Sequence, residues 1–204
     1  MNMPRVAMFA LVLTALFGAA DSANAAVHYY QAFLDGPSEF PANASPGTGY
    51  GTFDYDDTLH TLAIAFDFQG LTGTTTAAHL HAPTTIPGSG AAGVASTTPY
   101  FAGFPVGVTS GTYSNVLDLT LASSYNASFI TANGGTTATA EAALAAFFAA
   151  EKSYLNIHTS TFGGGEIRGF LVPVPEPSTL LLGGIGLITA VGYAVRHRRI
   201  VSTN

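Results

Sequence analysis

Short stretches in which apolar and polar residues alternate recur along the middle of the chain. Between residues 58 and 69, every second position is apolar, at Leu62, Ile64, Phe66 and Phe68. This is the period of a strand with one buried face. Similar runs, separated by segments rich in Gly, Pro, Asn, Asp and Thr, cover residues 29–34, 49–55, 77–81, 111–119, 154–159 and 166–172. Many short strands joined by turns predict an all-β domain over residues 27–172, a Greek-key β-sandwich or barrel.

One segment breaks the strand pattern. Residues 140–152 consist mainly of Ala, Leu, Phe and Glu, which favour helix. Thr139 is a candidate N-cap, and Glu141 would lie near the positive end of the helix dipole. We therefore expect one short helix that packs on the sheet through apolar residues at helical spacing, namely Leu144, Phe147 and Phe148.

The N-terminal end differs from this middle part. Residues 1–26 contain one base, Arg5, then an apolar run, then small residues that end in Ala25 and Ala26. This order predicts a signal peptide that signal peptidase removes. The alternative is a membrane anchor, but the apolar run is short for a bilayer, which requires about 20 apolar residues.

The C-terminal end has three parts. Residues 173–177 form a Pro-rich linker, residues 178–195 are predominantly apolar, and residues 196–204 begin with a basic cluster made by Arg196, Arg198 and Arg199. A helix over 178–195 would extend about 27 Å, enough to cross the hydrocarbon core. Because basic residues beside a span stay in the cytoplasm, the domain before it is expected outside the cytoplasm.

The linker contains Pro175, Glu176 and Pro177, and with the apolar span and the arginine-rich end it resembles the PEP-CTERM sorting signal. The resemblance implies recognition by an exosortase that cuts near the motif. An intermediate anchored in the inner membrane would then become a cell-surface or extracellular protein of a Gram-negative bacterium. The alternative, a plain membrane anchor with a Pro-rich stalk, predicts an uncleaved protein held in the membrane.

Composition excludes several classes of function. The chain has no Cys, so core burial must stabilise the domain without disulfides or thiolate metal sites. Residues 27–173 carry ten acidic side chains and two basic ones, which disfavours nucleic acid as a partner. Neither a Ser-His-Asp order, a phosphate-binding loop nor a zinc-protease helix is visible, so we assign no catalytic residue and expect no enzymatic activity.

Three histidines have positions that favour a shared site. His79 and His81 project from one face of their predicted strand, and His158 projects from one face of another. If these strands are neighbours, the three imidazoles can bind one transition-metal ion, copper, zinc or nickel rather than calcium or magnesium, with copper or zinc expected first. The simpler alternative is that the rings hydrogen-bond backbone or carboxylate groups and hold loops against the sheet. By the same alternation, Glu166 and Arg168 are expected to form a structural ion pair.

Residues 33–171 resemble the CHRD (chordin-type) domain family. The matching blocks include residues 34–39, 78–83, 154–159 and 164–169, whereas the segment 84–100 departs from the family pattern. The family is extracellular in animals, and the resemblance implies no particular activity for bacterial members. The His-x-His strand also resembles the Greek-key sandwich of copper–zinc superoxide dismutases. A bridging histidine and a second metal cluster are missing, so dismutase activity is not expected.

Two hypotheses about function follow. The first is an exported, exosortase-processed surface or extracellular-matrix protein whose non-enzymatic domain serves adhesion, matrix assembly or ligand binding, with extracellular polysaccharide or protein as the partner. The alternative is a transition-metal-binding or redox protein that uses His79, His81 and His158.

Overall fold

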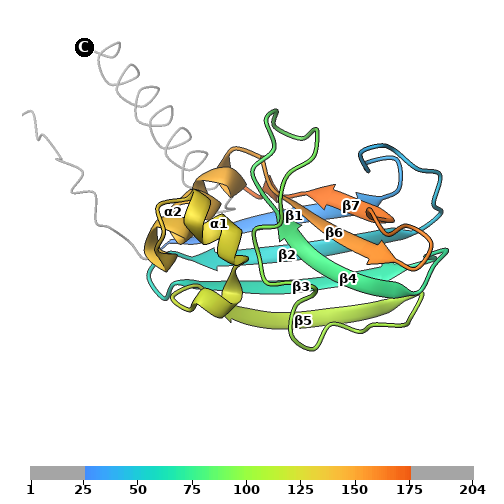
Figure 1. Ribbon diagram of the computed structural model, residues 1–204, viewed down its shortest axis with the longest axis horizontal. Coiled ribbons are helices and arrows are strands. Elements are labelled where there is room, and N and C mark those ends of the chain that lie inside the picture. Colours follow the sequence, from blue (N-terminus) through green and yellow to red (C-terminus); the bar gives the residue numbers. More distant parts are fainter. Residues whose placement is uncertain (1–25, 176–204) are drawn as a thin grey trace, which may run out of the picture.

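A computed structural model describes residues 26–175 of the chain (Figure 1). Eight strands form one sheet in the order β4-β6-β7-β1-β2-β3-β5, with β8 paired to β1, and every neighbouring pair is antiparallel. The strands are β1 (Val27–Asp35), β2 (Thr48–Asp56), β3 (Thr61–Gln69), β4 (Thr75–His81), β5 (Gly111–Asp118), β6 (Tyr154–Thr159), β7 (Ile167–Phe170) and β8 (Val172–Pro173). The all-β prediction is confirmed: the sheet curls into a half-barrel around one core.

Alternation along each strand decides which side chains enter this core. The four apolar positions predicted on β3 are all buried, and none exposes more than 4% of its surface. On the opposite half of the curled sheet, Leu80, Leu155 and Ile157 are completely buried and join the same core. The residues that alternate with them, including the histidines of β4 and β6, must therefore lie on the other face of the sheet.

The predicted helix is confirmed as α2 (Thr137–Ala149), which lies at one end of the sheet (Figure 1). It begins and ends three residues earlier than predicted. The reason is a capping box, in which Thr136 rather than Thr139 is the N-cap and the two side chains each accept the other residue's backbone N–H. Leu144 and Phe148 are buried as expected.

Two shorter helical segments precede α2. One is a 3₁₀ turn, Ala122–Ser124, and the other is α1 (Ala127–Ala132), whose N-cap Asn126 accepts the backbone N–H of Ser128. Neither was predicted, because six residues are too few to establish a helical period of apolar residues.

Glu141 of α2 fastens this helix to the sheet. Its buried carboxylate accepts a hydrogen bond from the Tyr55 hydroxyl at 2.9 Å and lies 2.9 Å from Nδ1 of His60. The hydrogen bond and the charge of Glu141 raise the pKa of His60. A carboxylate predicted to interact with the helix dipole therefore serves mainly as the link between α2 and the β2–β3 hairpin.

The predicted signal peptide up to Ala25, the spanning helix 178–195 and the basic tail 196–204 lie outside the described residues. Within residues 26–175, no helix is both long enough and apolar enough to cross a membrane.

Candidate metal centre

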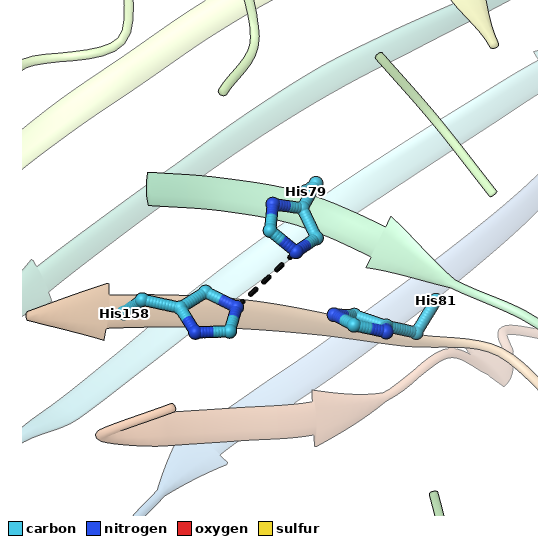
Figure 2. A group of neighbouring side chains, drawn as sticks. All are labelled: His79, His81 and His158. Atoms are coloured by element: carbon cyan, nitrogen blue, oxygen red, sulfur yellow. Dashed lines mark hydrogen bonds between the residues drawn. The ribbon is translucent and has the colours of Figure 1, made fainter. Parts of the chain in front are cut away.

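Three imidazole rings from two neighbouring strands meet on the outer face of the sheet (Figure 2). β4 and β6 pair so that His79 lies opposite Asn156 and His81 opposite Tyr154, with His158 two positions farther along β6. The ring centroid of His79 is 4.7 Å from those of both His81 and His158. The expected adjacency of these strands is present, and it brings together the three histidines.

Each ring is held by a backbone carbonyl group on its Nδ1 side. The distances from Nδ1 to oxygen are 3.0 Å from His79 to Pro99, 2.8 Å from His81 to Ala92, and 3.0 Å from His158 to Gly163. A carbonyl oxygen only accepts, so each Nδ1 carries the proton and donates it. In the neutral rings, every Nε2 is consequently left with a free lone pair.

These three Nε2 atoms converge. Those of His79 and His158 are 3.2 Å apart, as the dashed line in Figure 2 marks. Nε2 of His81 is buried and has no hydrogen-bond partner in the described part of the chain. One ligand atom from each ring lies within 4.8 Å of the others. The three Nε2 lone pairs therefore lie close together, and they can bind a proton or a metal cation.

Protonation of this cluster is disfavoured. Burial lowers the pKa of His79 to about 4, with a further lowering by the charge of His158. Burial also lowers the pKa of His81 to about 4, against its hydrogen bond to Ala92, and lowers the pKa of His158. All three rings are therefore neutral at pH 7, in the state that binds metals.

The metal-free domain is expected to lose stability as the pH falls from 6.5 to 4. In this window the unfolded chain protonates its histidines while His79 and His81 stay neutral in the folded state, which costs up to about 3 kcal/mol for each ring. The His81→Phe variant keeps an aromatic ring beside Tyr154 but loses one titrating group, so its loss of stability between pH 7 and pH 4.5 should be about 2 kcal/mol smaller. Urea unfolding in the presence of a chelator at pH 7 and pH 4.5 measures both; equal losses in the two proteins would contradict this account.

Tyr154 and Arg168 extend the cluster along the same face. The Tyr154 ring stacks on His81 with centroids 4.7 Å apart and planes 5° apart, and the guanidinium carbon of Arg168 lies 4.6 Å from the centroid of the Tyr154 ring. Arg168 also donates to the carbonyl groups of Gly90 and Ser38. It therefore ties the β1–β2 loop (residues 36–47) and the β4–β5 loop (residues 82–110) to the sheet beside the histidines.

The predicted ion pair between Glu166 and Arg168 does not form. The carboxylate near Arg168 is that of Glu39, whose Oε2 lies 3.9 Å from Nε of the arginine. The strand β7 begins only at Ile167, after Gly165 with a φ of 129°. Glu166 therefore precedes the strand, and the alternation that would place it beside Arg168 does not extend to it.

Glu166 instead accepts four hydrogen bonds inside the domain. The donors are the hydroxyls of Ser45 at 2.6 Å and Thr159 at 2.5 Å, and the backbone N–H groups of Thr72 at 2.5 Å and Gly73 at 3.1 Å. Burial acts to raise its pKa, but these hydrogen bonds outweigh burial and leave the pKa of Glu166 below its ordinary value. Glu166 therefore joins its own β6–β7 loop to the β1–β2 loop, which contains Ser45, and to the β3–β4 loop, which contains Thr72 and Gly73.

Sequence reasoning missed the part played by Glu39 and Tyr154, and it placed Asn156 on the same strand face as His158 without assigning it a role. Oε1 of Glu39 and Oδ1 of Asn156 are buried and have no hydrogen-bond partner among the described residues. Burial raises the pKa of Glu39 to about 7, although the charge of Arg168 opposes the shift. For Asn156 and Tyr154 a signal was present, because both share a strand face with His158.

Comparisons with known proteins give two matches, which adjoin along the chain. The model of the CHRD domain family matches residues 30–171, and the model of the PEP-CTERM protein-sorting motif matches residues 173–199. No curated protein and no solved structure matches the chain.

Proposed function

Because this chain belongs to the CHRD domain family and carries a PEP-CTERM sorting motif directly after the domain, we propose that it is a non-enzymatic component of the extracellular matrix of a Gram-negative bacterium. The motif implies export, a membrane-anchored intermediate, processing by an exosortase and a cell-surface or extracellular destination. Removal of residues 1–26 by signal peptidase and adhesion to matrix polysaccharide through the domain are the further parts of the proposal.

The observation that carries the proposal is the place where the domain ends. β8 pairs Val172 and Pro173 with β1, and the N–H of Val174 donates to the carbonyl of Tyr29 at 2.8 Å. The next residue, Pro175, is exposed and begins the Pro-Glu-Pro motif. The fold is complete before the motif starts, so cleavage there would release an intact domain. This supports the domain itself as the delivered cargo.

An exposed aromatic surface on β1 and β2 supports adhesion to polysaccharide. Phe33 is 68% exposed and Tyr29 is 42% exposed, and the rings of Phe33 and Tyr50 lie 4.9 Å apart. A hollow of about 470 Å³ beside them is lined partly by Gln31 and Thr52. Aromatic faces can pack on the C–H faces of sugar rings while neighbouring polar groups hydrogen-bond the hydroxyls.

One fractionation experiment tests delivery and adhesion together. The full chain and its variants are expressed in a bacterium that has an exosortase and an extracellular polysaccharide matrix, and the membrane, matrix and medium are separated. Wild-type protein should be found in the matrix with the mass of a chain shortened at both ends. The variant with Pro175, Glu176 and Pro177 all replaced by Ala should remain in the membrane with its C-terminal segment.

The aromatic surface is tested in the same fractions. The Phe33→Ala/Tyr50→Ala variant should be shortened normally but appear mainly in the medium, at least tenfold depleted from the matrix. Ser114→Ala, which changes an exposed residue on β5, should behave as wild type. Normal processing of the motif variant would overturn delivery by an exosortase, and matrix retention of the double variant would overturn the adhesion surface.

A further inference from the structure

We propose that His79, His81 and His158 form a binding site for one transition-metal ion, copper or zinc, which is coordinated by Nε2 of each ring. The site is independent of the aromatic surface, because it lies on β4 and β6 in the opposite half of the curled sheet. Three protein ligands leave at least one coordination position for a molecule from solvent. The least buried of the three rings is that of His158, so access is from its side.

The spacing of the nitrogen atoms fits such an ion. Metal–nitrogen bonds of about 2.0–2.1 Å in tetrahedral geometry place neighbouring ligand atoms about 3.3 Å apart. Nε2 of His79 and Nε2 of His158 are 3.2 Å apart. The His81 ring must approach by up to about 1.5 Å to complete the set, since the ligand atoms of the three rings lie within 4.8 Å of one another. The Nε2 atoms of His79 and His158 thus already have the separation that a shared metal ion requires.

The orientation of the rings also favours a cation. With every Nδ1 donating to a carbonyl group, Nε2 of His79 and Nε2 of His158 present lone pairs to each other at 3.2 Å. That contact is repulsive unless a positive charge lies between the two atoms. Nε2 of His81 is a third lone pair, buried and without a partner in the described residues. One metal ion would satisfy all three atoms.

The carbonyl groups supply what metal-binding histidines need from their surroundings. A ligating imidazole typically donates its other N–H to a carbonyl or carboxylate, which fixes the tautomer and the ring plane. Here the backbone oxygens of Pro99, Ala92 and Gly163 do this for the three rings. Tyr154 stacks on His81 and limits its rotation. The ligand set is therefore preorganised before an ion arrives.

The chemistry of the ligands selects the ion. Three neutral imidazoles suit copper and zinc, whereas calcium and magnesium require oxygen ligands. Between the two, copper(II) is expected to bind more tightly than zinc, following the general order of stability for divalent ions.

The test uses the full chain, purified in detergent without a metal-affinity tag, stripped with a chelator, and titrated with copper(II) sulfate or zinc sulfate. One ion should bind per chain, the melting temperature should rise, and the chelator should reverse the rise. Electron paramagnetic resonance of the copper(II) form should show coupling to three nitrogen ligands. Failure to bind one equivalent of either ion would overturn the proposal.

Matched histidine variants locate the ion. His79→Phe, His81→Phe and His158→Asn should each weaken binding at least 100-fold. The controls His28→Ala and His60→Ala change histidines outside the cluster and should alter affinity less than twofold. Because His79 and His81 are buried and their variants risk misfolding, circular dichroism is recorded for each, and the half-buried His158 provides the decisive comparison. Unchanged binding in His158→Asn, or three-nitrogen coupling that persists in it, would contradict the site.

Discussion

The Glu166→Ala variant is expected to lose a large part of the free energy of unfolding of the domain. Removal of this carboxylate leaves four donors without a partner, the hydroxyls of Ser45 and Thr159 and the N–H groups of Thr72 and Gly73. Each buried unsatisfied group costs about 1–3 kcal/mol. The expected loss is therefore at least about 4 kcal/mol, against a total stability of roughly 5–15 kcal/mol for a domain.

Urea unfolding of Glu166→Gln and of Asp67→Asn completes this comparison. Gln keeps one acceptor oxygen and should lose less stability than Ala, whereas the exposed Asp67 of β3 should change stability by about 0.5 kcal/mol or less. Because the pKa of Glu166 is lowered by folding, its ionised form stabilises the domain above the ordinary carboxyl pKa. The advantage of wild type over Glu166→Gln should therefore shrink as the pH falls through the lowered pKa. A Glu166→Ala protein as stable as wild type would refute the role of this carboxylate.

The second large effect is expected for Gly169→Ala on β7. A Cβ at this position would clash with the backbone of Phe33 and approach the amide nitrogen of Leu34 to 3.2 Å. These are main-chain atoms of β1, which cannot move aside as a side chain would. β7 joins the two halves of the curled sheet, and Arg168 lies opposite Asp35 across this junction. Forcing the strands apart should cost about 3 kcal/mol or more.

Gly163→Ala is the matched control, since a Cβ there would have no heavy atom within 4 Å. Its melting temperature should stay close to that of wild type, whereas Gly169→Ala should melt at least about 6 °C lower, at roughly 2–4 °C per kcal/mol for a domain of this size. Equal melting temperatures would show that β7 can leave β1 without cost.

Regular alternation made most of the fold predictable. A strand with one face in the core has apolar residues at every second position, as β3 has at Leu62, Ile64, Phe66 and Phe68. The three histidines were predictable for the same reason, since positions 79, 81 and 158 all fall on the outer phase of their strands. Only the adjacency of β4 and β6 had to be assumed.

What could not be predicted depends on loops. Glu39, and not Glu166 as predicted, lies beside Arg168. The reason is that Glu166 precedes the strand β7, whereas Glu39 lies in the β1–β2 loop. The N-cap of α2 is Thr136 and not Thr139 as predicted. Both threonines can cap a helix, and only the course of the backbone distinguishes them. Pairing between distant loops leaves no periodic trace in the sequence.

Main-chain oxygens, rather than side chains, orient the three imidazoles. Pro99 and Ala92 belong to the β4–β5 loop, and every amino acid has the main-chain oxygen that each of them contributes. Substitutions in this loop can therefore change its side chains without changing the orientation of the imidazole rings, provided that the backbone conformation is retained. In homologous chains the histidines should persist while the residues that aim them diverge freely.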